Sequence, residues 1–263
     1  MKISVFEYAY AFDDKNFIVE GKAMLNLIVK GLKKENIKVN KIKLKDKKNY
    51  KEEILNYVEN TDFTILIAPN YELLSICKFL YEKNLYEKIL ISPIDSIENT
   101  LNKWKLYRKI NKEILMPKTE IFNDPDINFD FPFILKPIYG TGCEDIYLFE
   151  NYEKFKEISK KFNSNFIIQE FIDGIHCSVS LFCSKEIFPA SLNLQRIKFL
   201  NYKGLRKLEY KGGIVPFDID CKITRDLKEK IFEISKKACK ILNLKGYIGI
   251  DFVIKDKIYL IEI

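Results

Sequence analysis

The stretch GYIGIDFVIKDKIYLIEI, residues 246–263, is the part of the sequence that decides the fold. Two apolar runs are separated by the polar residues Lys-Asp-Lys, and this predicts an antiparallel hairpin with strands over 247–254 and 257–263. The first strand carries Asp251 and the second carries Glu262. A turn centred near Asp256 brings residue 250 opposite about residue 262, so we expect the two carboxylates to lie close together.

Two adjacent carboxylates in a buried hairpin repel each other unless a proton or a hard cation lies between them. A magnesium ion bound to nucleotide phosphates would satisfy Asp251 and Glu262. The other interpretation is a pair of independent acids that face solvent. The hairpin therefore indicates a metal site, with an ordinary solvated surface as the alternative.

A lysine and a glycine-rich turn lie further upstream. Lys136 ends an apolar strand expected over 131–137, and an uncompensated buried charge is so costly that this lysine must reach an opening or a partner. Tyr-Gly-Thr-Gly-Cys, residues 139–143, follows as a flexible turn whose backbone N–H groups could approach phosphate oxygens. Its spacing matches neither a Walker loop nor a Rossmann fingerprint, and a plain hairpin is the other interpretation.

The segment Gln-Glu-Phe-Ile-Asp-Gly, residues 169–174, ends an apolar strand and enters a turn. Backbone groups at such a crossing can bind an adenine edge while apolar side chains enclose the ring. An ordinary β-connection is equally compatible with the sequence. His176, the single histidine, lies just beyond and could meet a ribose hydroxyl or be purely structural.

The remainder of the chain divides near residue 100. The first part alternates short apolar strands with amphipathic helices, which predicts an α/β domain with a parallel sheet; its strands are expected over 2–8, 37–44, 62–68 and 88–92, and its helices over 17–35, 50–60 and 71–83. The second part mixes helices with mostly antiparallel strands, an α+β pattern; helices are expected over 101–113, 152–162 and 224–242, and strands over 131–137, 145–149, 166–171, 177–183 and 187–199.

Composition narrows the class of protein. The chain has 263 residues, 47% hydrophobic and 31% charged, which suits a globular protein with a large core. No apolar run is long enough to span a bilayer, and an acid at Glu7 interrupts any signal peptide, so we expect a cytoplasmic protein without a membrane partner. The net charge of +7 comes from lysines spread along the predicted helix faces, which favours a solvated surface over nucleic-acid binding.

Two kinds of site are made improbable. The six cysteines contain no Cys-x-x-Cys pair, so neither a zinc site nor a disulfide framework is expected. A single histidine argues against Ser-His-Asp triads and histidine-rich metal centres.

The ordered set of motifs resembles the ATP-grasp superfamily over residues 100–263, and the α/β beginning resembles the domain that precedes that fold. The resemblance rests on Lys103, Leu135-Lys136-Pro137, the segment at 169–174, Asp251 and Glu262. It implies an α/β pre-ATP-grasp domain with a parallel sheet over 1–100, followed by a two-lobed α+β ATP-grasp fold. The small lobe would cover 101–172 and the large lobe 173–263.

The same resemblance assigns roles to residues. Lys103 and Lys136 would hold ATP phosphates, and Gly140, Thr141 and Gly142 would form a glycine lid over them. Gln169 belongs to the adenine motif, in which Glu170 and Ile172 would meet the base. His176 would lie at the ribose, where many relatives have an acid. Asp251 and Glu262 would hold Mg²⁺ or Mn²⁺.

The sequence departs from the superfamily at two positions. Many relatives place an arginine two residues before the first metal carboxylate, where this chain has Gly249. Arg196 or Arg206 would have to supply that charge to the transferred phosphate, and residues 193–216 are a candidate lid over the carboxylate substrate. Relatives also continue the last motif as Glu-x-Asn, so we expect the natural polypeptide to extend past Ile263.

The reaction implied is ATP-dependent ligation of a carboxylate to an amine through an acyl phosphate, with ADP as a product and small molecules as substrates. Four stretches, at 5–8, 174–180, 191–197 and 210–216, resemble an archaeal branch of the superfamily that joins the γ-carboxylate of L-glutamate to tyramine for methanofuran biosynthesis. Three alternatives remain: a superfamily ligase acting on another amino acid, peptide or carrier protein, a nucleotide-binding protein without catalysis, and a basic nucleic-acid module. The sequence does not determine the oligomeric state.

Overall fold

The computed structural model describes residues 1–15, 17–123, 129–202, 205–217 and 223–263. Two compact units make up the chain, Met1–Ile94 and Asp95–Ile263. The division lies close to the boundary expected near residue 100. The limits expected for the two lobes within the second unit remain predictions.

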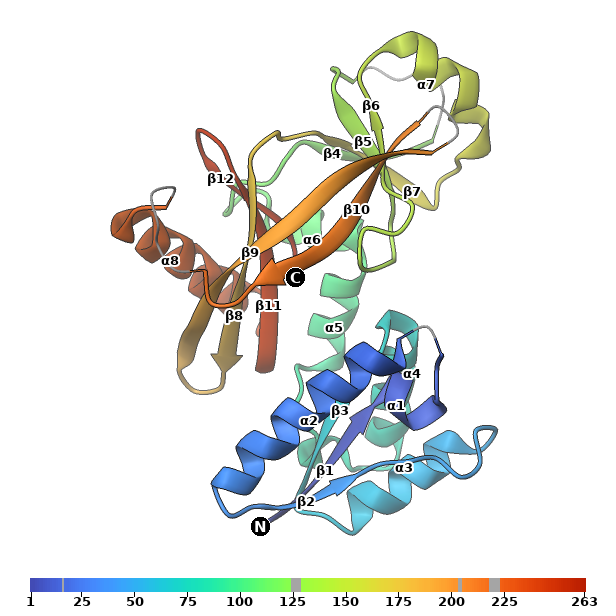
Figure 1. Ribbon diagram of the computed structural model, residues 1–263, viewed down its shortest axis with the longest axis vertical. Coiled ribbons are helices and arrows are strands. Elements are labelled where there is room, and N and C mark those ends of the chain that lie inside the picture. The colour runs from blue at the N-terminus through green and yellow to red at the C-terminus, as the bar shows by residue number, and fades with distance from the viewer. Residues whose placement is uncertain (16, 124–128, 203–204, 218–222) are drawn as a thin grey trace. The chain divides into compact units, whose positions relative to one another are not determined.

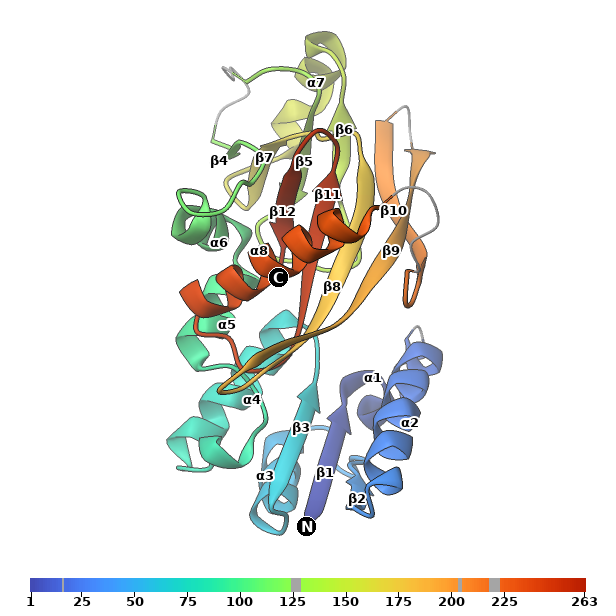
Figure 2. The ribbon, with the colours of Figure 1, turned by 90° about the vertical axis from the view of Figure 1, so that its left-hand side faces the viewer.

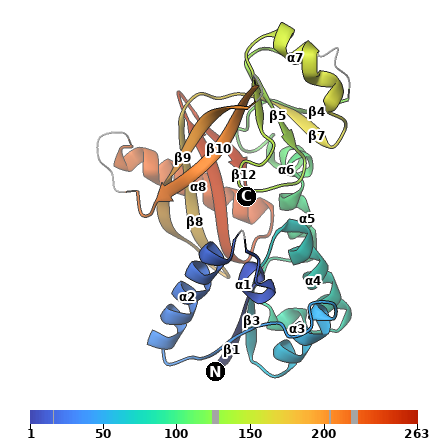
Figure 3. The same cartoon turned by 45° about the vertical axis from the view of Figure 1, so that its right-hand side comes forward.

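The first unit is built on a small parallel sheet with the strand order β2-β1-β3. Its helices lie on both faces, with α2 on one side and α3 and α4 on the other (Figures 1 and 3). The core forms where apolar residues of β1 and β3 pack against one side of α2. The elements are β1 (Lys2–Glu7), α1 (Tyr8–Phe12), α2 (Ile18–Lys34), β2 (Lys38–Lys41), α3 (Tyr50–Glu59), β3 (Phe63–Ile67), α4 (Asn70–Glu82) and a 3₁₀ turn η1 (Tyr86–Lys88).

The prediction of a strand over residues 88–92 in this unit is wrong. Residues 88–92 form only an isolated parallel bridge, between Thr64 and Ile89. The η1 turn includes Lys88, the backbone bends at Ile91, and Pro93 precedes α5, so the extended conformation is interrupted on both sides of the bridge at Ile89.

The second unit contains a nine-stranded sheet with the order β12-β11-β8-β9-β10-β6-β5-β7-β4, in which every pairing is antiparallel. Helix α8 lies across β8, β11 and β12 and covers one face of that end (Figure 2). The strands are β4 (Thr119–Ile121), β5 (Phe133–Pro137), β6 (Tyr147–Phe149), β7 (Phe166–Glu170), β8 (Ile175–Cys183), β9 (Ile187–Tyr202), β10 (Leu205–Ile214), β11 (Gly246–Ile254) and β12 (Ile258–Glu262). The helices are α5 (Ile94–Leu101), α6 (Lys103–Ile110), α7 (Tyr152–Ile158), the 3₁₀ turn η2 (Ser159–Lys161) and α8 (Arg225–Ile241).

Apolar clusters on this sheet leave the polar face of β8, β9 and β11 free for a site. One cluster joins α6 and α8 to β8, β11 and β12 through residues such as Leu106, Ile231 and Phe252. A second, mostly aromatic cluster gathers Phe133 and Phe149 of β5 and β6 around Phe155 of α7. Both clusters hold strands in place, and other side chains of these strands line the cavity described below.

Residues 193–216, the candidate lid over the carboxylate substrate, lie largely in two paired strands. Residues 194–202 and 205–214 belong to the β9–β10 ladder, which runs from the pair Leu205–Tyr202 to the pair Ile214–Leu194. Most of the segment is therefore part of the sheet, and its role as a lid remains a prediction. Among the described residues, no helix has the length and apolar character needed to cross a membrane.

Candidate active site

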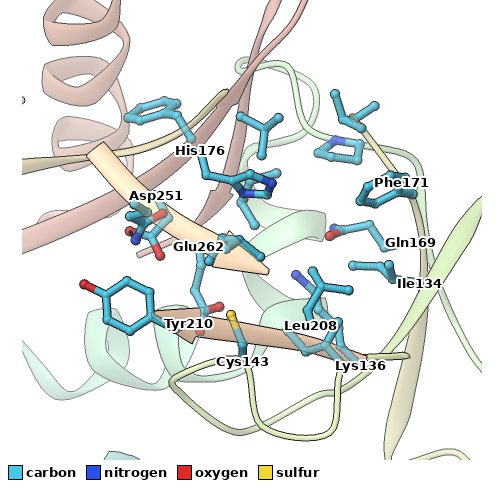
Figure 4. Close-up of a pocket in the computed structure, with 18 of the residues that line it drawn as sticks. Ile134, Lys136, Cys143, Gln169, Phe171, His176, Leu208, Tyr210, Asp251 and Glu262 are labelled. Carbon is cyan, nitrogen blue, oxygen red and sulfur yellow. Dashed lines mark hydrogen bonds between the residues drawn. The ribbon is translucent and has the colours of Figure 1, made fainter. Parts of the chain in front are cut away.

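A cavity of about 410 Å³ opens on the second unit, a size typical of small-molecule sites. It is lined by residues of β5, β7, β8, β9, β10, β11 and β12 and of the turn between β5 and β6. Figure 4 shows the cavity with its charged and apolar walls. Among the described residues, those that line the cavity all come from the range 117–263, within the second unit.

The predicted hairpin of β11 and β12 is confirmed, and it places the two carboxylates together. Asp251 lies directly opposite Glu262 in the ladder, one residue away from the predicted register because a bulge follows Asp251. The pKa of Asp251 is raised to about 6: burial is the main cause and the charge of Glu262 contributes, while a hydrogen bond from Gln195 and the charge of Lys136 oppose the shift. The pair is therefore a site of concentrated negative charge (Figure 4).

Two lysines face these acids. Lys136 of β5 is only 1% exposed, and burial lowers the pKa of its ammonium to about 8, with the charge of Lys103 adding to the shift and Glu262 opposing it. Lys103, the first residue of α6, is 5% exposed; its Nζ donates to the Gly140 carbonyl at 2.7 Å and lies 3.1 Å from Glu262 Oε1. Both lysines are buried beside the cavity and lie near carboxylates whose charge a bound cation could neutralise. Lysines in such surroundings are suited to bind a polyanion.

The glycine-rich turn joins these lysines to the cavity. Gly140 and Gly142 have φ values of 142° and 65°, which favour glycine. Gly142, Thr141 and Cys143 line the main cavity, and Gly140 and Thr141 line a smaller recess beside Lys103 and Glu262. The turn thus lies where the sequence analysis expected it, next to both lysines.

The adenine-motif residues have different surroundings. Gln169 is buried and its Nε2 donates to Thr119 Oγ1 at 2.7 Å, which ties β7 to β4. Glu170 is exposed and accepts a bond from the Lys118 backbone N–H at 3.3 Å. Ile172 is buried. All three line the cavity.

His176 also lines the cavity, at the start of β8. Burial lowers the pKa of its imidazole, and the charge of Asp173 opposes that shift. A neutral imidazole can donate or accept a hydrogen bond, and a ribose hydroxyl can partner either.

The structure does not bring Arg196 or Arg206 to the cavity. Arg196 is exposed and lies between Gln195 and Ile197, which both line the cavity, so strand alternation turns Arg196 to the opposite face of β9. Arg206 binds Glu150 Oε1 at 2.5 Å and stacks over Phe199 at 4.3 Å. A role for either arginine at the transferred phosphate remains a prediction.

Sequence reasoning missed several residues of the site. Gln195 of β9 lines the cavity and donates from Nε2 to Asp251 Oδ1 at 3.0 Å. An apolar wall comes from five residues scattered over the chain, Ile134, Ile146, Phe171, Ile197 and Leu208. The alternation of the strands could have indicated which side chains share a face, but only the order of strands brings these faces together.

The donor set fits a hard cation in part. Asp251 and Glu262 supply carboxylate oxygens, the ligands that Mg²⁺ and Mn²⁺ prefer, and their mutual repulsion leaves a demand for positive charge. No group of three or more His, Cys, Asp or Glu residues suited to a metal is found within the described ranges. Phosphate oxygens and water could supply further ligands of a cation.

Comparison with known proteins agrees with this geometry. The ATP-grasp domain family matches residues 100–263. A tyramine–L-glutamate ligase of Methanocaldococcus jannaschii is 32% identical over 99% of this chain and 80% of the relative, and the ligase of the same name from Methanocaldococcus fervens is 29% identical over 99% and 85%.

Solved structures match as well. An ATP-grasp superfamily protein from Archaeoglobus fulgidus has a TM-score of 0.75 and 26% identity, covering all of this chain and 79% of the other. The D-alanine–D-alanine ligase of Bacillus anthracis complexed with ATP has a TM-score of 0.71, with 100% and 85% covered, but at 19% identity it supports the fold alone. The family match and the relationship to a ligase over 99% of this chain show that the chain belongs to the ATP-grasp family, as an ATP-dependent, amide-forming ligase.

Proposed function

We propose that the protein joins the γ-carboxylate of L-glutamate to the amine of tyramine, with ATP converted to ADP and phosphate. The observation that carries this proposal is the 32% identity, over 99% of the chain, to the tyramine–L-glutamate ligase of Methanocaldococcus jannaschii. The γ linkage follows from the archaeal branch that the sequence resembles. The cavity supports the proposal because it combines buried lysines with paired carboxylates.

In this proposal the nucleotide lies along the cavity. The apolar wall around Phe171 encloses the base beside Glu170 and Ile172, and His176 meets the ribose. Lys103, Lys136 and the turn of Gly140, Thr141 and Gly142 hold the phosphates. Asp251 and Glu262 hold Mg²⁺ or Mn²⁺, which when bound supplies positive charge to the phosphates.

The chemistry has two steps. An oxygen of the γ-carboxylate attacks the γ-phosphorus of ATP, the bond to the bridging oxygen of ADP breaks, and an acyl phosphate forms. The amine nitrogen of tyramine then attacks the acyl carbon, inorganic phosphate leaves, and the amine loses a proton as the amide forms. Lys103 and Lys136 stabilise charge on the transferred phosphoryl group, so the protein acts by positioning and by electrostatics.

The first prediction tests this assignment directly. ADP release is measured with ATP and Mg²⁺, with L-glutamate alone, with tyramine alone, with both, and with other amino acids and amines in place of each. We expect sustained ADP release only when glutamate and tyramine are both present. Mass spectrometry and fragmentation of the product should identify a γ-glutamyl amide.

Other outcomes would change the assignment in different ways. Turnover with a different amino acid or amine, and none with tyramine, would retain the ligase and reject these substrates. Binding of ATP without turnover of any pair would favour a nucleotide-binding protein. An α-linked product would reject only the position of the new bond.

A further inference from the structure

The hydrogen bond between Gln195 and Asp251 crosses a whole strand of the sheet. Asp251 of β11 pairs with Ser178 of β8, and Ser178 pairs with Asn193 of β9. Gln195 lies two residues beyond Asn193 on the same face of β9, yet its Nε2 is 3.0 Å from Asp251 Oδ1. The side chain therefore reaches across β8, on the cavity side of the sheet.

From this contact we infer that Gln195 is a positioning residue that fixes Asp251 for metal binding. The inference rests on the proposed role of Asp251 and Glu262 as metal ligands. It concerns a residue that contacts neither reacting atoms nor, in the proposal, the cation itself. Its effect is transmitted through the orientation of one carboxylate.

The chemistry of the two groups sets the direction of the bond. An ionised carboxylate only accepts hydrogen bonds, so the donating Nε2 of Gln195 must face it. Asp251 is half-buried and lies opposite the like charge of Glu262. Without a hydrogen-bond donor, repulsion between the two carboxylates favours rotation of the Asp251 carboxylate away from Glu262. Gln195 occupies Oδ1 and leaves Oδ2 available, with the rotation of the carboxylate restricted.

An amide serves this purpose better than a charged donor would. A lysine at this position would neutralise Asp251 and compete with the cation, whereas an amide stabilises the ionised carboxylate and adds no net charge. Hydrogen-bond partners of ligating carboxylates commonly change metal affinity by about 10–100-fold when removed. We expect an effect in this range for Gln195.

The test measures the metal directly. Mn²⁺ binding to the full chain with saturating ADP is followed by electron paramagnetic resonance, for the natural protein and for Gln195→Met, which keeps similar length but has no donor. The expected result is a Kd for Mn²⁺ raised about 10–100-fold. The Mg²⁺ concentration for half-maximal ADP release should rise in parallel, while the KM for tyramine stays unchanged.

Two further variants separate positioning from structure. Lys198→Met changes an exposed residue of the same strand and should leave the Mn²⁺ affinity unchanged. Gln195→Asn keeps an amide in the cavity but is one methylene too short to cross β8, so it should lose affinity like Gln195→Met. This second variant tests the inference even if Gln195→Met fails to fold.

The outcomes are distinguishable. If the natural protein binds Mn²⁺ and a folded Gln195 variant binds it within twofold, the positioning role is refuted and the proposed metal site stands. If the natural protein with ADP does not bind Mn²⁺, the metal site and this inference both fail, whatever the substrates are. Turnover with a substrate pair other than glutamate and tyramine would leave the inference intact.

Discussion

Lys136 shows how a single residue can be prepared for an anionic ligand. Its ammonium is almost completely buried, and burial lowers its pKa from 10.5 to about 8. Part of the charge is offset by Glu262, whose carboxylate is also paired with Lys103. A bound polyphosphate would stabilise the protonated lysine, so ligand binding and protonation should be linked.

The second prediction follows from that linkage. The affinity of the natural protein for ADP, measured by calorimetry, should fall as the pH rises through about 8, because Lys136 loses its proton. Lys136→Met should weaken binding about 10–100-fold at pH 7 and should remove most of this pH dependence. Lys105→Met, at an exposed position of α6, serves as the control.

The stability of the free protein should respond with the opposite sign. Because the lysine pKa is lower in the folded state, the unfolded chain binds more protons between about pH 8 and 10.5, so this residue adds stability as the pH rises through that window.

Unchanged ADP affinity and turnover in Lys136→Met would show that this lysine does not contact phosphate.

At the scale of elements, two glycines near the β8–β11 pair have opposite surroundings. A Cβ at Gly174, between β7 and β8, would lie 2.4 Å from the Ile254 carbonyl oxygen of β11. Nothing lies within 4 Å of a Cβ at Gly249, on β11 itself. The glycine of the adenine motif therefore allows the start of β8 to approach the end of β11.

The third prediction compares alanine at both sites. Gly174→Ala should lower the free energy of unfolding by about 1–3 kcal/mol, because the backbone of β8 and β11 must separate. Gly249→Ala should be neutral or stabilise by up to about 1 kcal/mol, since alanine reduces the entropy of the unfolded chain without a clash. Urea denaturation of both variants measures the difference. Equal effects would contradict the packing argument.

At the scale of the whole molecule, the cavity belongs to one of the two compact units. The lining residues that the structure describes, and both lysines, lie within Asp95–Ile263. That unit has its own extensive core, formed by α6 and α8 against β8, β11 and β12. Nucleotide binding should therefore not require the first unit.

The fourth prediction is that residues 95–263, produced alone, fold and bind ADP within about fivefold of the full chain, because a unit with a large core of its own can fold independently. Calorimetry gives the affinity, and circular dichroism confirms the fold. Lys136→Met in the same fragment should weaken this binding about 10–100-fold, as in the full chain, and is the control. A folded fragment that does not bind ADP would show that the first unit contributes to the nucleotide site.

The sequence by itself determined the features that depend on neighbours along the chain. Apolar runs around a tight turn determined the β11–β12 hairpin and the closeness of Asp251 to Glu262, while the bulge that sets their direct pairing was not predicted. An isolated charge in an apolar strand identified Lys136, and glycine spacing identified the turn at 140–142. Local periodicity and turn chemistry suffice there, because the contacts span few residues.

Tertiary structure decided the contacts between distant strands. Gln195 meets Asp251, and Lys103 meets Glu262, only because the strand order brings β9, β11 and β12 beside α6 and one cavity. The same order leaves Arg196 on the opposite face and pairs Arg206 with Glu150. Periodicity assigns a side chain to a face of its own strand, but which strands are neighbours, and how far a side chain reaches, depends on the packing of the whole sheet.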